Sequence, residues 1–137
     1  MSLSNGTLAA VGFRTVMGFN MLMHGLVRLP DLAGFAGYLQ STFGDTILPG
    51  PLVTAFAYGL TFVEAAIGVA LLACWQVRLT CLVSMATMIS LIFGSSLVGE
   101  WGWVSTQTTY AAFFAGLLLL NDHDRPWTAV AAGLCQR

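Results

Sequence analysis

Two charged residues lie well inside long apolar stretches of this chain, where a charge is costly. Glu64 is near the middle of the stretch 52–75, and Arg14 lies in the stretch 8–29. An ionised carboxylate in hydrocarbon must be paired, hydrated or neutralised. Glu64 is therefore either a proton-carrying or ligand-binding acid, or a structural acid that bonds to a neighbouring helix.

The depths of these two residues predict that they pair. With a rise of about 1.5 Å per residue, Arg14 lies about 9 Å from the inner end of its stretch. The next stretch runs in the opposite direction, and a core about 30 Å thick puts Glu64 about 12 Å from the same boundary. We therefore expect an Arg14–Glu64 ion pair inside the protein, and loss of one partner should cost about 3–5 kcal/mol.

A second polar group gathers near the opposite, outer end of the same stretches. His24 lies about 6 Å inside that end, and its expected neighbours at this depth are Tyr58, Gln107 and Tyr110. An apolar pocket with a His or Tyr donor suits a quinone, whose ring is apolar and whose carbonyls accept hydrogen bonds. The alternative is a histidine whose hydrogen bonds are satisfied by a neighbouring carbonyl or hydroxyl.

Haem and metal chemistry have less support. His24 is the one histidine in the apolar stretches, and no C-x-x-C-H motif occurs. His123 between Asp122 and Asp124 resembles a cluster of metal ligands, but adjacent polar residues in a short tail are more typical of a solvated cap. We expect no metal site and no intrinsic cofactor.

The cysteines and the remaining motifs do not predict an enzyme of a known soluble class. Cys74, Cys81 and Cys135 form no C-x-x-C pair and are expected to behave as small apolar residues. The sequence contains no nucleophilic triad, phosphate-binding loop or flavin fingerprint. An electron carrier would have to come from a partner or be a lipid-soluble quinone.

The composition of the chain distinguishes a membrane protein from a soluble one. The 137 residues are 57% hydrophobic and 8% charged, with five arginines, no lysine and six acids. Soluble domains carry roughly a quarter charged residues. The chain also offers no basic face for nucleic acid. We therefore predict a single-domain, all-α integral membrane protein.

Four stretches approach the length of about 20 apolar residues that a spanning helix needs. They cover residues 8–29, 52–75, 79–98 and 104–120. Residues 31–43 carry apolar side chains at helical spacing after a capping Asp31. We expect a four-helix bundle with an amphipathic interfacial helix at 31–43, lying over one end.

Charge and glycine patterns predict the orientation and the packing. Arg78, Arg125 and Arg137 fall on one side of the membrane, against Arg28 on the other, so both termini are expected in the cytoplasm and the protein in the inner membrane. Small residues let helices approach closely. The expected packing glycines are Gly18, Gly25 and Gly68.

The first two spans and their flanks combine small, charged and polar residues at Arg14, Gly18, His24, Gly25, a basic position at Arg28, the stretch 34–39, Glu64, Gly68 and Arg78. This pattern resembles the DoxX family of small four-span membrane proteins, and the resemblance covers most of the chain. It differs at Arg28, where the family usually has Lys, and in segment 120–127, which lacks a glycine-rich turn. The family includes subunits of quinone-linked thiosulfate oxidoreductases and proteins of membrane redox complexes, so the resemblance implies a membrane redox context.

Three functions remain open. The first is an accessory subunit of a larger membrane redox or energy-converting complex, which contacts lipid and other subunits through 79–98, 104–120 or the tail 126–135. The second is a quinone-dependent oxidoreductase subunit with His24 and Glu64 in its own site. The third, a small-solute transporter with Glu64 as the coupling acid, ranks last because span 79–98 carries no charge.

Overall fold

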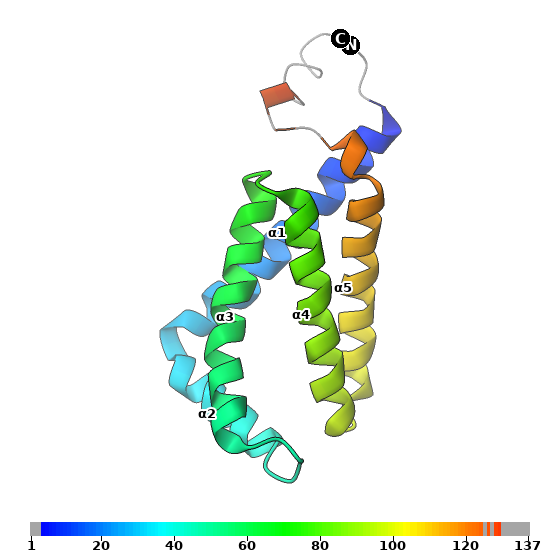
Figure 1. Cartoon of the computed structure of the whole chain (residues 1–137). Coiled ribbons are helices and arrows are strands. Elements are labelled where there is room, and N and C mark those ends of the chain that lie inside the picture. Colours follow the sequence, from blue (N-terminus) through cyan, green and yellow to red (C-terminus); the bar gives the residue numbers. More distant parts are fainter. Residues whose placement is uncertain (1–3, 125, 127, 130–137) are drawn as a thin grey trace.

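The computed structural model describes residues 4–124, 126, 128 and 129, and the regular elements in this part of the chain are all helices (Figure 1). The prediction of an all-α protein is confirmed. Two short 3-10 helices, η1 (Leu29–Asp31) and η2 (Asn121–His123), follow α1 and α5. The main helices are α1 (Asn5–Arg28), α2 (Leu32–Thr42), α3 (Gly50–Leu72), α4 (Val77–Leu97) and α5 (Trp101–Leu119).

Two helices among the described residues are long and apolar enough to cross a membrane. These are α3 and α4, judged by length and composition. The similarly long α1 and α5 are more polar, since α1 carries two arginines and the first half of α5 is rich in Ser, Thr and Gln. Length and composition therefore support a membrane location through α3 and α4.

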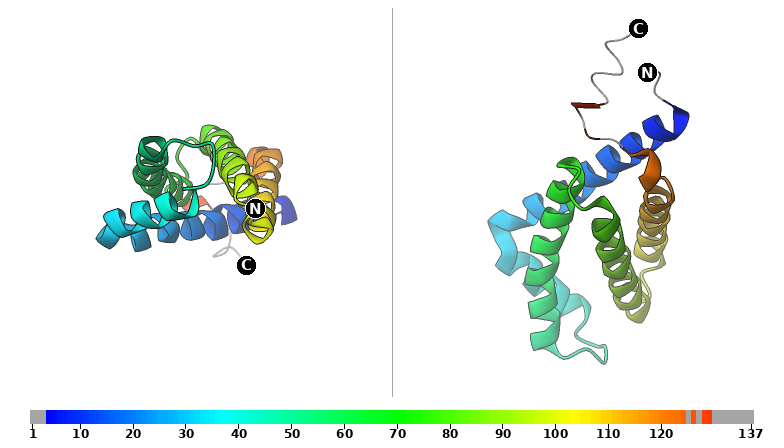
Figure 2. Two further views of the ribbon diagram at one scale, coloured as in Figure 1. Left: turned by 90° about the horizontal axis from the view of Figure 1, so that it is seen from below. Right: turned by 45° about the horizontal axis from the view of Figure 1, so that its top comes forward.

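The four long helices form two antiparallel pairs. α1 packs against α3, and α4 packs against α5, while α3 and α4 touch much less. In Figures 1 and 2 the two pairs meet near the turn 73–76 and diverge toward α2. We call the region around 73–76 and η2 the closed end, and the region around 43–52 and 98–101 the open end.

Glycines set the register of α1 on α3. A Cβ placed on Gly68 would lie 2.3 Å from the backbone nitrogen of Leu22, and one on Gly25 would lie 2.6 Å from the Cβ of Ala65. Gly18 lies in the same interface but faces leucine side chains. All three glycines with a predicted packing role therefore lie between α1 and α3, with Leu22 level with Gly68.

The segment between α1 and α3 is helical, as its apolar spacing predicts. Asp31 caps α2, because its side chain accepts a hydrogen bond of 2.9 Å from the backbone N–H of Gly34. α2 packs on the first half of α3, which leaves the second half of α3 for α1. This contact buries Ala36, Leu39, Val53 and Ala57.

The main apolar core lies where the two helix pairs meet. Cys81 belongs to it as a fully buried, small apolar residue, as its sequence context predicts. Cys135 lies outside the described residues. The buried members of this core are Met17, Met21, Ile67, Leu71, Val77, Cys81, Met88, Phe114 and Leu117.

The turn between α3 and α4 yields a first testable prediction. Gln76 is exposed and has a left-handed backbone, with φ 47° and ψ 43°, and its side chain makes no capping hydrogen bond. Gln76→Gly is expected to raise the free energy of unfolding by about 0.5–1 kcal/mol, because glycine has no Cβ to clash in this conformation. Thermal unfolding in detergent measures the change.

The control for this turn is Gln76→Ala, which also removes the polar side chain but keeps the Cβ. It is expected to leave the unfolding temperature unchanged. An equal gain from alanine and glycine would show that the left-handed conformation at this position stores no strain.

Candidate binding pocket and buried ion pairs

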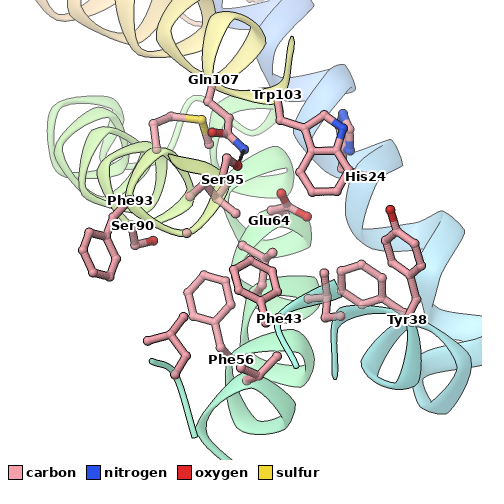
Figure 3. Close-up of a pocket in the computed structure, with 18 of the residues that line it drawn as sticks. His24, Tyr38, Phe43, Phe56, Glu64, Ser90, Phe93, Ser95, Trp103 and Gln107 are labelled. Atoms are coloured by element: carbon pink, nitrogen blue, oxygen red, sulfur yellow. Dashed lines mark hydrogen bonds between the residues drawn. The ribbon is translucent and has the colours of Figure 1, made fainter. Parts of the chain in front are cut away.

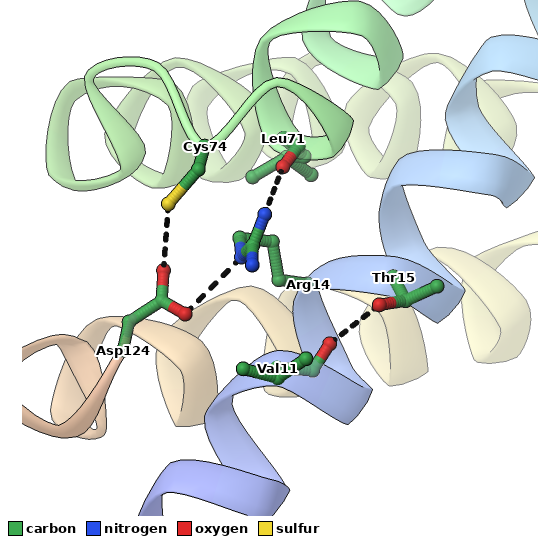
Figure 4. A network of polar contacts seen from close by, with 6 residues as sticks. All are labelled: Val11, Arg14, Thr15, Leu71, Cys74 and Asp124. Atoms are coloured by element: carbon green, nitrogen blue, oxygen red, sulfur yellow. Dashed lines mark hydrogen bonds and ion pairs between the residues drawn. The ribbon is translucent and has the colours of Figure 1, made fainter. Parts of the chain in front are cut away.

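A buried arginine forms hydrogen bonds to several elements at the closed end. The Arg14 side chain is fully buried, and its Nε donates to Oδ1 of Asp124 at 3.1 Å. Its Nη1 donates to the backbone carbonyl of Leu71 at 3.0 Å, and the thiol of Cys74 points to the other oxygen of Asp124 (Figure 4). The cluster therefore joins α1, the end of α3, the turn 73–76 and the segment after η2.

The prediction of an Arg14–Glu64 ion pair is wrong. Arg14 pairs with Asp124, and Glu64 forms an ion pair with Arg28. The depth argument assumed that α1 ends, and α3 begins, at the same outer boundary, but the first half of α3 packs on α2. Since Leu22 is level with Gly68, Glu64 is level with the carboxyl-terminal end of α1 and out of reach of Arg14.

The interpretation of residues 122–124 as a solvated cap is also wrong in one respect. His123 and Asp122 are exposed, but the side chain of Asp124 is only 5% exposed and holds Arg14. Cys74 likewise departs from the expectation of a purely apolar role, since its Sγ lies 3.6 Å from Asp124 Oδ2. Sequence alone gave no distance between these positions and Arg14.

A pocket of about 510 Å³ lies between the two helix pairs at the open end. Helices α1 to α5 and the loop after α2 all contribute to its lining. Figure 3 shows several of its polar groups around the indole of Trp103, on the side away from two phenyl rings. His24, Glu64, Ser95 and Gln107 lie at one end, and the rings of Phe43 and Phe56 lie at the other.

The polar end of the pocket is partly organised by hydrogen bonds and ring contacts. Gln107 Nε2 donates to Ser95 Oγ at 2.8 Å, which links α5 to α4. The rings of His24 and Tyr110 meet edge to face with their centroids 6.2 Å apart. Within the described part of the chain, Gln107 Oε1 is the one buried side-chain nitrogen or oxygen without a hydrogen-bond partner.

The Arg28–Glu64 ion pair forms one wall of this polar end. The Glu64 side chain is 5% exposed, and that of Arg28 is 22% exposed. The guanidinium of Arg28 also lies over the ring of Phe35, 4.4 Å from its centroid, in a cation–π contact. One arginine thus joins α1, α2 and α3, and a charged pair borders the cavity.

The structure brings together three of the four residues predicted to form a ligand site. His24, Gln107 and Tyr110 line the pocket, whereas Tyr58 does not and is 37% exposed. At 100° per residue, Tyr58 lies about 200° around the helix from Phe56, which faces the cavity. The sequence prediction placed Tyr58 by its depth in the membrane and did not consider which side of its helix it lies on.

Sequence reasoning missed the aromatic end of the pocket and the role of Arg28. A signal was available in α3, where apolar residues recur every four positions up to Glu64 and so share its face. Those residues are Leu52, Phe56 and Leu60, and all three line the cavity.

Comparison with known proteins found no matching family model, no matching curated protein and no matching solved structure. Among the described residues, no group of three or more His, Cys, Asp or Glu side chains is placed to hold a metal ion. The chemistry of the site must therefore be inferred from the pocket and from its ion pair.

Proposed function

We propose that this chain is a four-span subunit of a larger membrane redox complex and that its pocket binds a quinone. The observation that carries the proposal is the pocket of about 510 Å³, which has several polar groups at one end and phenyl rings at the other. A membrane quinone has the same division, with carbonyl groups on a flat ring and an apolar tail. The volume of the pocket also falls in the usual range for small-molecule sites, about 300–1,000 Å³.

The proposed ligand lies with its ring at the polar end and its tail along the aromatic end. His24 and Tyr110 can donate to a carbonyl oxygen of the ring. Phe43 and Phe56 line the path of the tail. Glu64 borders the ring, where its carboxyl group can pass a proton when a partner subunit reduces or oxidises the quinone.

In this proposal α1, α3, α4 and α5 all cross the inner membrane, and α2 lies at its outer interface. Pairing supports this placement, because Arg14 and Arg28 of α1 both have carboxylate partners. In α5, hydroxyl groups such as that of Thr108 donate to their own helix backbone, which lowers their cost in lipid. Arg78 supports cytoplasmic termini; Arg125 and Arg137 lie outside the described residues.

The partner subunits are proposed to bind the exposed apolar sides of α4 and α5. α4 exposes Leu82, Ile89 and Phe93, which suit helix packing better than salt bridges. Most of the tail 126–135, the third expected contact, lies outside the described residues. The resemblance to DoxX proteins, some of which are subunits of quinone-linked oxidoreductases, supports the same assignment.

Large subunits should copurify with this chain in mild detergent, and a fully active lone monomer would contradict its assignment to a larger complex.

Tryptophan fluorescence tests the quinone site. Trp103 lines the pocket, whereas Trp75 lies exposed in the turn at the closed end. Titration with decylubiquinone is expected to quench fluorescence saturably at micromolar concentrations, because a bound quinone lies against Trp103. Trp103→Phe should remove most of this saturable quenching, and the matched control Trp75→Phe should retain it.

The contrary result is equally clear. Quenching that rises linearly with quinone, and to the same degree in the wild type and both variants, would indicate collisions in the detergent micelle and no bound ligand. The pocket would then have to serve another molecule.

A further inference from the structure

One face of α1 combines exposed apolar side chains with a polar amide. Val16 is 61% exposed, Phe19 60% and Met23 40%. Asn20 lies among them, partly exposed, in a shallow groove between α1 and α5. Its side-chain amide makes no hydrogen bond to any of the described residues.

The depth of Asn20 makes this amide unusual, if α1 crosses the membrane as the proposed function requires. Leu22 is level with Gly68, so Asn20 is level with about Ala70 of α3. That position lies about 9 Å from the turn at Gln76, at about 1.5 Å per residue. An unpaired amide would there face hydrocarbon, which cannot hydrogen-bond to it.

The spacing of this face matches a two-helix seam. Val16, Asn20, Met23 and Val27 follow one another at intervals of four, three and four, the a/d spacing of a heptad. Val27 is 70% exposed, so the three apolar residues of this line are all exposed, while Asn20 is half-buried beside α5. An asparagine at one core position of such a seam sets the register and favours pairs.

We propose that this face of α1 binds the same face of a second copy of the chain, with the two Asn20 amides hydrogen-bonded to each other. Copies inserted into one membrane share their orientation, so their α1 helices run parallel and Asn20 meets Asn20 at equal depth. An amide carries both donors and an acceptor and is therefore self-complementary. A two-fold axis uses the same patch twice, which needs no second partner sequence.

Cysteine cross-linking in native membranes tests the geometry. The starting protein has Cys74, Cys81 and Cys135 replaced by alanine, and single cysteines are added as Met23→Cys or Val27→Cys, both of which keep the Asn20 amide. Oxidation is expected to yield disulfide-linked homodimers several-fold more efficiently than with Leu82→Cys. The control residue Leu82 on α4 is 47% exposed, but it lies outside the proposed interface.

A second measurement tests the amide without any cross-link. Single-molecule photobleaching in vesicles should show that Asn20→Leu lowers the dimer fraction about tenfold at equal protein density, while Asn20→Gln retains it. Equal dimer fractions in Asn20→Leu and the wild type would overturn the proposal. So would cross-links at Leu82→Cys as efficient as those at Met23→Cys, or cross-links to a different protein.

Alkaline carbonate extraction separates this inference from the proposed function on which it rests. Protein that stays in the membrane pellet but gives no homodimer overturns the dimer alone and leaves the quinone site standing. Protein released by carbonate overturns the membrane placement and the dimer together.

Discussion

Gly68→Ala is expected to destabilise the protein by about 3 kcal/mol or more, since it forces a side chain into a fully occupied interface. The added Cβ would lie 2.3 Å from the backbone nitrogen of Leu22 and 2.5 Å from its Cα. Backbone atoms cannot rotate away as a side chain can, so α1 and α3 must move apart. Unfolding in a graded denaturant such as SDS, followed by circular dichroism, measures the loss.

The matched control is Gly59→Ala, in the same helix, where an added Cβ meets nothing within 4 Å. This variant is expected to keep or slightly raise stability, because alanine is the better helix former by about 1 kcal/mol. Similar midpoints for Gly59→Ala and Gly68→Ala would contradict the close approach of α1 and α3. A separation of these helices should also weaken quinone quenching, because both line the pocket.

Arg14→Met is expected to cost about 3–5 kcal/mol, because the buried carboxylate of Asp124 loses its ion pair with Arg14. The two side chains are 0% and 5% exposed, so water cannot replace the lost partner. Removing both charges in Arg14→Met with Asp124→Leu is expected to recover most of this loss, since both charges of the buried pair are then absent. The double-mutant cycle is measured by the same denaturant series.

An exposed arginine provides the control for charge removal at the same end. Arg78 begins α4 near the turn 73–76 and is exposed. Arg78→Met should change stability by no more than about 0.5 kcal/mol. The pairing of Arg14 with Asp124 would be contradicted if the double variant lost as much stability as Arg14→Met alone and Asp124→Leu alone lose together.

Local patterns were sufficient to predict the helices. The apolar stretches and the spacing in 31–43 correspond to α1 to α5, and Asp31 caps α2 as its position indicates. These features depend on residues within a few turns of one another. Their hydrophobic periodicity and capping chemistry can therefore be recognised without knowing the tertiary structure.

The partners of the buried charges could not be predicted in the same way. The depth of Glu64 relative to α1 depends on how far α3 extends along α2, and the sequence around Glu64 contains no information on that length. Tyr58 shows the second limit, since equal depth does not decide which way a side chain faces. Arg28 and Glu64 instead meet because the glycines of α1 and α3 fix their register.

The link between Arg14 and Asp124 also has a consequence for biosynthesis. The two residues are 110 positions apart. At a ribosomal rate of about 5–20 residues per second, Asp124 is made roughly 5–20 s after Arg14. During that interval the rest of α1 and all of α2 to α5 are translated, while Arg14 has no acid from position 124 to neutralise it. The closed end therefore reaches its final electrostatic state only after α5 has left the ribosome, and a nascent chain stalled inside α5 should expose Arg14 to insertion and quality-control factors.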